Sequence, residues 1–169
     1  MSRILKPRPL TREAFRRFGD VIEARASDAP REINQGYGLR FDDLAQVHAG
    51  AGRAIVSIFR SKPLALPFTI RTMERHPLGS QAFVPLSGRP YLVVVAPAGP
   101  FDMNAVEAFV ASERQGVNFR PGVWHHFNLA LVEESEFLVI DRDGPGDNLE
   151  EVFWSEAEAP ILVAPDALP

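Results

Sequence analysis

The stretch Glu74-Arg75-His76-Pro77-Leu78-Gly79-Ser80-Gln81 places a carboxylate, an imidazole and an amide on either side of a turn signal. Glu74 and His76 are two residues apart, so on a strand both side chains point to the same face. A turn at Pro77–Gly79 returns the chain and brings Gln81 to the same side on the next strand. The stretch therefore predicts two consecutive β-strands that share one polar cluster.

A second polar segment, Pro121-Gly122-Val123-Trp124-His125-His126, follows farther along the chain. His125 and His126 are adjacent, so on a strand their rings face opposite sides. At most one of them therefore joins an interior cluster. We expect His125 to join the polar side chains of the first stretch and His126 to point away from them.

Short apolar runs separated by glycine and proline surround these two segments. Many short runs with turn residues between them predict a β-sandwich or a β-barrel. A first strand is predicted over Asp20–Glu23. The strands predicted after residue 53 are Ala54–Arg60, Phe68–Glu74, Gln81–Leu86, Tyr91–Ala96, Gly116–Phe119, Phe127–Val132 and Phe137–Asp141.

Two helices and a tail complete the predicted elements. Thr11 is the expected N-cap of a short helix through Arg17, which places Phe15 on an apolar face. A second helix is predicted over Asn104–Val110. The Pro- and Ala-rich tail, Ala157–Pro169, is expected to pack loosely or to cross to a partner subunit.

Length and composition limit the protein class. The chain has 169 residues, which fits one domain spanning residues 1–169 with a single core. Hydrophobic residues make up 46% and charged residues 24%, as in globular proteins. The net charge of −4 does not favour nucleic acid or anionic membranes as partners. No cysteine is present and no apolar stretch follows the charged N-terminal residues, so we expect a cytoplasmic protein.

The two polar segments resemble the two sequence motifs of cupins. The first cupin motif has His-x-His, then Glu, then Gly seven residues later, and here Glu74-x-His76 precedes Gln81 and Gly88. The second motif ends in Gly-x-x-His, as Gly122-Val123-Trp124-His125 does. Glu74 therefore replaces a histidine and Gln81 replaces a glutamate. The resemblance implies a mainly β fold: a cupin-type double-stranded β-helix, or jelly-roll, barrel with a few short helices.

A longer resemblance, from about Leu10 to Trp154, is to ureidoglycolate lyases. Its most specific part is the run from Glu74 to Leu86, and Ile33-Asn34-Gln35-Gly36 is similar to the family's Ile-Asn-Asn-Gly. The other matching runs are Phe18–Glu23, Ser57–Arg60, Gln115–Asn118, Gly122–His126 and Phe137–Arg142. The resemblance implies a homodimer that cleaves ureidoglycolate to glyoxylate and urea in allantoin (purine) catabolism. It also implies a divalent metal such as nickel.

Such a substrate requires two proton transfers. One carbon of ureidoglycolate carries a hydroxyl, a carboxylate and the ureido nitrogen. Its cleavage needs a proton taken from the hydroxyl and a proton given to the departing nitrogen, which imidazole and carboxyl groups perform. The catalytic candidates are His125 as the preferred base, together with Glu74 and His76.

Binding residues are predicted on the same chemical grounds. The substrate carboxylate suits an arginine fork, for which Arg60 and Arg142 are the candidates. The other substrate-binding candidates are Asn34, Gln81 and Trp124. The metal-ligand candidates are Glu74, His76, Gln81 and His125. Because Gln81 is neutral, the metal is expected to be weakly held, so that a purified sample is partly empty.

Purely structural roles are alternatives to several of these assignments. Asp141 and Arg142 also fit an ordinary ion pair at a strand end, Trp124 fits a core or pocket-wall position, and Asn34 fits a turn. Other functions also remain open: a hydrolase that releases ammonia from the same substrate, a non-catalytic ureide sensor, or a metal-dependent oxygenase or isomerase on the same barrel.

Overall fold

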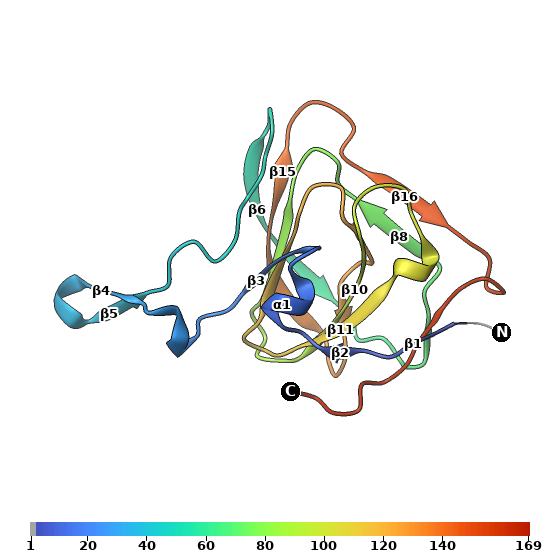
Figure 1. Cartoon of the computed structure of the whole chain (residues 1–169), viewed down its shortest axis with the longest axis horizontal. Helices are drawn as coiled ribbons and strands as arrows, with labels where there is room; N and C mark the ends of the chain where they lie inside the picture. The colour runs from blue at the N-terminus through green and yellow to red at the C-terminus, as the bar shows by residue number, and fades with distance from the viewer. Residues whose placement is uncertain (1–2) are drawn as a thin grey trace.

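Two large β-sheets form the body of the molecule in a computed structural model that describes residues 3–169 (Figure 1). One sheet has the strand order β3-β12-β9-β15-β6, and the other has the order β16-β8-β13-β10-β11-β2, with β14 also pairing with β10. The strands of the first are β3 Gly19–Ile22, β12 Gly116–Phe119, β9 Gln81–Pro85, β15 Ser135–Asp143 and β6 Arg53–Ser61. Those of the second are β16 Glu150–Phe153, β8 Thr72–Arg75, β13 Trp124–His125, β10 Tyr91–Ala96, β11 Glu107–Ala111, β2 Arg8–Pro9 and β14 Leu129–Ala130.

The remaining elements are short. A three-stranded sheet joins β1 Ile4–Leu5, β17 Ile161–Leu162 and β7 Phe68–Thr69, and a separate hairpin joins β4 Arg31–Ile33 to β5 Gly38–Arg40. The helical elements are α1 Arg12–Phe15, η1 Ala26–Asp28, η2 Asn34–Gly36 and η3 Met103–Ala105. The expectation of a mainly β, cupin-type fold with a few short helices is confirmed. Among the described residues, no helix is both long and apolar enough to span a membrane.

Strand β10 shows how the layers are held together. Its residues are all buried, but alternate side chains enter two different apolar clusters. Tyr91, Val93 and Val95 face the five-stranded sheet, with Phe119 and Phe137. Leu92, Val94 and Ala96 face the opposite way and pack in a second cluster that includes residues of β1 and β17. The molecule therefore has three sheet layers with an apolar interface on each side of the middle one. Because β10 lies in the middle layer, both of its faces are buried and its sequence is continuously apolar.

Most of the predicted strands are confirmed, and two differ in extent. Strands β10 and β12 have the predicted bounds, and β6, β9 and β15 agree within two residues. The segment Phe68–Glu74 forms two strands, β7 and β8, in different sheets. Only Leu129–Ala130 of the segment Phe127–Val132 is a strand. The N-terminal helix is confirmed, with the Thr11 hydroxyl accepting from the Ala14 N–H, although it ends at Phe15.

The helix predicted over Asn104–Val110 is wrong. The turn η3 covers Met103–Ala105, and Glu107–Ala111 is strand β11, paired antiparallel with β10. Residues 108–111 are all buried because β11 is covered on both faces. Such a run has apolar residues at helical as well as at strand spacing, so periodicity alone does not separate the two.

The C-terminal tail is also tied down, contrary to the loose packing expected. Strand β17 lies between β1, with which it pairs in parallel, and β7, with which it pairs antiparallel. Ala159 and Leu162 are completely or almost completely buried by their own chain. The apolar stretch at 160–163 therefore covers the second apolar cluster of the same molecule.

Candidate active site

Glu74, His76 and His125 converge in the interior, on the side of β8 and β13 that faces the five-stranded sheet. Glu74 and His125 are directly paired across β8 and β13, so their side chains share a face. One ligand atom from each of the three residues lies within 4.8 Å of those of the other two. The Glu74 Oε1 atom is 3.8 Å from His76 Nε2 and 3.8 Å from His125 Nδ1.

Backbone carbonyls set the orientation of both imidazoles. The Nδ1 atom of His76 lies 2.7 Å from the Asn148 carbonyl, and Nδ1 of His125 lies 3.3 Å from the His126 carbonyl. A carbonyl only accepts, so each Nδ1 carries the proton and donates it. The Nε2 atoms of both rings are buried and have no hydrogen-bond partner among the described residues. Each ring therefore keeps a free lone pair on Nε2; His76 turns this atom toward Glu74, whereas the His125 atom near Glu74 is Nδ1.

Burial shifts the pKa values of His125 and Glu74 in opposite directions. His125 is 1% exposed, and burial, together with the neighbouring His76, lowers its pKa to about 3. Burial also raises the pKa of the Glu74 carboxyl above its ordinary value; the adjacent His76 opposes this and Glu151 adds to it. His125 is consequently neutral at neutral pH, whereas Glu74 holds its proton more readily than an exposed glutamate.

Gln81 and Phe119 form the opposite wall. They are directly paired across β9 and β12, so both side chains project from the same face of the five-stranded sheet. The Phe119 ring stacks on the His125 ring, with centroids 4.4 Å apart and planes within 3°. Gln81 is 6% exposed, and its side-chain carbonyl oxygen has no hydrogen-bond partner in the described structure. Gln81 therefore lies on the sheet face that carries Phe119 toward His125, and its membership of the cluster stays a prediction.

His126 points away from this cluster, as strand alternation predicts. Its ring contacts Phe68 at a centroid distance of 5.8 Å and Phe127 at 3.9 Å. Its Nδ1 donates to the Phe127 carbonyl at 3.1 Å. Burial lowers its pKa to about 4. The neutral ring is thus part of the packing behind the second sheet.

We expect His126 to contribute to loss of stability in acid. Its pKa rises from about 4 in the folded protein to an ordinary value near 6.5 on unfolding, so the unfolded chain binds more protons between these pH values. The free energy of unfolding therefore decreases as the pH falls through this range. His126→Gln removes this contribution, and its melting temperature should fall less than that of wild type between pH 7 and pH 4.5. Equal falls would contradict this. His48→Gln, at an exposed histidine, is the control.

Comparison with known proteins identifies the family of the chain. A family model described as ureidoglycolate lyase matches residues 2–161. The chain belongs to the ureidoglycolate lyase family. It is 54% identical over 163 residues to a ureidoglycolate lyase of Burkholderia mallei, covering 95% of this chain and 93% of that one. It is 52% identical over 166 residues to a ureidoglycolate lyase of Azotobacter vinelandii, covering 96% and 99%.

In this member of the ureidoglycolate lyase family, both arginines predicted to bind the substrate already donate to other groups of the chain. Arg60 is exposed on β6 and pairs with Glu136, with its Nη2 2.6 Å from the carboxylate. Arg142 donates to the carbonyls of Ala49, at 3.0 Å, and of Gly144 and Pro145. Arg142 therefore fixes two loops together, and it does not pair with Asp141.

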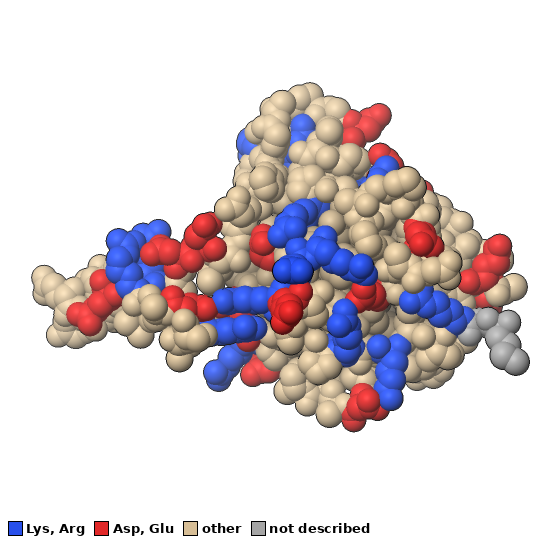
Figure 2. Space-filling model, in the orientation of Figure 1, with Lys and Arg blue, Asp and Glu red and all other residues tan. Residues whose placement is uncertain are grey.

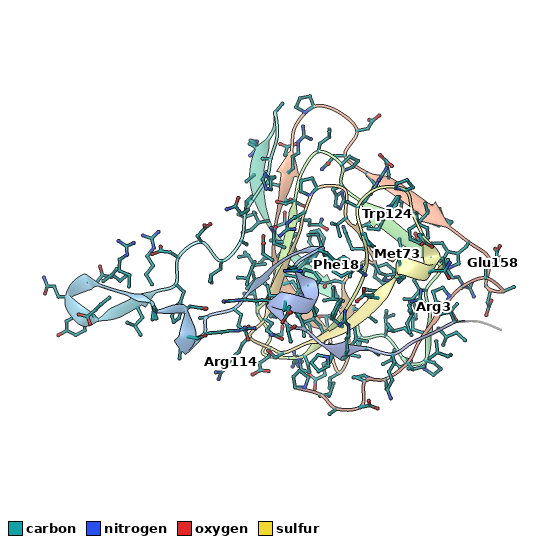
Figure 3. All side chains as sticks on the ribbon, in the orientation of Figure 1. Arg3, Phe18, Met73, Arg114, Trp124 and Glu158 are labelled. Carbon is teal, nitrogen blue, oxygen red and sulfur yellow. The ribbon has the colours of Figure 1, made fainter. Side chains whose placement is uncertain are left out.

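Trp124 and Asn34 also lie away from the cluster. Trp124 is 4% exposed and packs in the apolar cluster on the other face of its sheet, as does Met73 (Figure 3). Its indole N–H donates to the Gly99 carbonyl, and the Arg75 guanidinium lies 4.6 Å from its ring centroid. Asn34 lies in η2, at the tip of the projecting hairpin. The structure thus brings together Glu74, His76 and His125, and it places the two arginines, Trp124 and Asn34 elsewhere.

Two site residues were absent from the sequence-based prediction. Phe119 stacks on His125, and the alternation within the correctly predicted strand β12 carried the signal for its inward orientation. Asn148 holds His76 through its backbone carbonyl and the Leu78 N–H through its side chain, at 2.8 Å. The sequence contains no signal for Asn148, because it lies in a loop distant in sequence.

Proposed function

We propose that this protein is a ureidoglycolate lyase that splits ureidoglycolate into glyoxylate and urea. The observation that carries the proposal is the interior group of one carboxyl and two imidazoles, whose Nε2 lone pairs are free. This group supplies the proton acceptor and proton donor that cleavage of a carbinolamine requires. The family membership of the chain supports ureidoglycolate as the substrate.

In the proposed mechanism, His76 Nε2 accepts the proton of the substrate hydroxyl. The hydroxyl oxygen then forms the aldehyde carbonyl of glyoxylate while the bond between carbon and the ureido nitrogen breaks. The protonated Glu74 carboxyl donates to the departing nitrogen, which leaves as urea. The resulting imidazolium and carboxylate lie 3.8 Å apart and stabilise each other until water returns the protons to their starting positions.

For His125 we propose a different role from the base role that the sequence favoured. A ring with a pKa of about 3 remains unprotonated at neutral pH but is a weak proton acceptor. We therefore assign hydroxyl deprotonation to His76, whose side chain is 17% exposed and so less enclosed. His125, fixed by Phe119 and the His126 carbonyl, orients the hydroxyl through its Nε2 lone pair.

The same residues fit a divalent metal. Each imidazole donates its Nδ1 proton to a carbonyl and keeps Nε2 free, which is the arrangement typical of metal-binding histidines. Glu74 would add a carboxylate oxygen, and Gln81, whose side-chain carbonyl oxygen has no partner in the described structure, is the candidate for a neutral fourth ligand. A divalent ion such as nickel, bound there, would occupy the His76 Nε2 and Glu74 atoms used for proton transfer, and would itself acidify the substrate hydroxyl in their place. A nitrogen–oxygen set without a thiolate suits several divalent ions.

We expect this metal to be weakly held. The proposed ligands carry a single carboxylate charge, because Gln81 is neutral. Dialysis against a chelator should leave a folded protein with little nickel, and added nickel should rebind and raise the melting temperature. Element analysis and thermal melts measure both effects. Full metal occupancy after prolonged dialysis would contradict weak binding.

We also propose that the protein is a homodimer. The C-terminal stretch at 160–163 does not support this, since it packs on its own chain. The exposed outer face of the five-stranded sheet does support it, because Val56 and Ile58 are 67% and 53% exposed there. A cytoplasmic location also remains a prediction.

Product analysis tests the proposed function. Purified protein incubated with ureidoglycolate should form glyoxylate and urea in equal amounts, without ammonia above the blank. Ammonia in place of urea would establish the hydrolase alternative. Saturable ureidoglycolate binding without either product would establish a ureide sensor.

A further inference from the structure

A narrow arm projects from the body of the molecule. We define the arm as residues 29–45, which contain β4, η2 and β5 (Figure 1). Its two strands form a sheet of their own and pair only with each other. An isolated two-stranded hairpin is at best marginally stable in water. The arm therefore lacks the packing that would hold it on its own chain.

Both ends of the arm are nevertheless anchored firmly. At the outgoing end, the Arg12 guanidinium binds the Asp28 carboxylate, with contacts of 2.6 and 2.8 Å. At the returning end, the side chain of the fully buried Asn118 donates to the Gln46 carbonyl at 3.0 Å and to Asp20 at 2.9 Å. Asp20 also accepts from the Gln46 N–H at 3.1 Å. These bonds fix where the arm leaves the body and where it returns.

The arm exposes apolar side chains that a monomer would be expected to cover. Tyr37 is 93% exposed and Leu39 is 62% exposed. The tip carries no charged side chain in the view of Figure 2. A compact monomer of 18.7 kDa exposes about 8,300 Å², whereas this chain exposes 9303 Å². The excess of about 1,000 Å² is similar to the roughly 800 Å² that each partner buries in a stable complex.

A matching surface lies on the outer side of the five-stranded sheet. Val56, Ile58 and Leu86 are each more than half exposed, and all three lie on β6 or at the end of β9. Strand β6 is also an edge strand, nine residues long, whose outer side is unpaired in the described sheet. A long apolar edge of this kind is a template on which another chain can pair.

The shape of this surface favours a second copy as the partner. By strand alternation, Arg60 and its partner Glu136 lie on the same face as Val56 and Ile58, whereas Arg53 and its partner Asp143 lie on the other face. The carboxylate of Glu136 already neutralises Arg60, so the charge on this face does not oppose a second copy. Each copy offers both an arm and a sheet face, so two copies can exchange the same contact about a two-fold axis.

The returning end of the arm leads directly to the rim of the active site. The Ser80 N–H donates to the His48 carbonyl at 2.9 Å, and Arg142 donates to the Ala49 carbonyl at 3.0 Å. Residues 48–52 thus border the turn at Pro77–Gly79, which follows His76. The arm, the β6 face and the rim are therefore contiguous. A copy docked on that face therefore lies beside the rim of its neighbour.

We propose that the arm of one copy closes the active site of a second copy, so that Asn34 binds the substrate in trans and Tyr37 covers it. This proposal rests on the proposed function. Arg60 and Arg142 are engaged elsewhere, so the substrate carboxylate needs another donor, and the Asn34 amide provides one. Asn34 and Gln35 have φ angles of 53° and 59°, which turn the chain at the tip.

Heterodimers with two different defects test this proposal. One subunit carries Glu74→Gln, which disables the cluster. The other carries Asn34→Gly with Tyr37→Ala, which removes the arm's side chains while glycine retains the positive φ. Each homodimer should be nearly inactive in urea release. A heterodimer isolated through two different tags should recover about half of the wild-type activity, because the intact arm meets the intact cluster at one site.

The other outcomes overturn the proposal. An inactive heterodimer would show that the arm serves its own subunit, and a fully active arm variant would show that the arm is not needed. Asn104→Ala, at an exposed asparagine of η3, is the matched control and should retain activity.

A cross-link keeps the test independent of activity. The chain contains no cysteine, so Tyr37→Cys in one tagged copy and Leu78→Cys in another introduce one thiol each. Mild oxidation should give a disulfide between the two tagged copies. Absence of this product would overturn the arm proposal. A wild-type protein that forms no urea, but whose variants cross-link, would overturn the proposed function and retain the arm.

Discussion

His76→Ala should lower kcat for urea release by about 10²–10⁴-fold, the usual contribution of a positioned proton-transfer group, and His125→Ala should also lower kcat because the substrate hydroxyl loses its orientation. Both rings face Glu74 and hold a free Nε2 in the interior. His126→Ala should keep most of the activity, because its ring packs against Phe68 and Phe127 on the other side of the sheet. Initial rates, read together with melting temperatures, separate chemistry from folding.

The two active-site histidines should also differ from each other. If His76 accepts the proton, His76→Ala mainly lowers kcat. If His125 orients the hydroxyl, His125→Ala lowers kcat and raises KM. A folded but inactive His126→Ala variant would indicate that the reaction takes place on the other face of β13. Full activity in His125→Ala would remove that ring from the site.

Phe119→Ala should cause the largest loss of stability among the residues of the site. Phe119 is 5% exposed and lies against His125, Phe15 and Phe83, with centroid distances of 4.4, 6.1 and 6.0 Å. Truncation of a buried phenylalanine costs about 3–5 kcal/mol. For a chain of this length, the melting temperature should fall by about 10 °C.

The matched control for this change is Phe153→Ala, because Phe153 is 71% exposed. Its melting temperature should stay close to that of wild type. Phe119→Leu should recover part of the loss, since it refills much of the volume without the stacked ring. A Phe119→Ala variant as stable as wild type would show that this ring does not hold the two sheets together at His125.

Local patterns predicted the centre of this site, because its residues are near one another in sequence. The Glu74-x-His76 spacing, the turn at Pro77–Gly79 and the alternation of His125 and His126 each fix which face a side chain takes. The resemblance to cupins then joined the two segments, and the register of β8 with β13 places Glu74 opposite His125.

Other features depend on contacts that no local pattern encodes. Arg142 can bind a carboxylate, but its donors are occupied by the carbonyl of Ala49, which is distant in sequence, and by that of Gly144 in the following loop. Strand β11 has apolar residues at helical spacing, and only its pairing with β10 makes it extended. The position of Asn34 at the tip of an arm likewise depends on anchors at Asp28 and Gln46, far from the tip in space.

The most direct test of the central claim is the initial rate of urea release by Glu74→Gln compared with wild type. Glutamine keeps the size and hydrogen bonding of Glu74 but donates no acidic proton to the leaving nitrogen. A rate lowered by about 10²-fold or more, with an unchanged melting temperature, is the predicted result. A rate equal to that of the wild type would contradict the assignment of Glu74, with His76 and His125, as the catalytic centre.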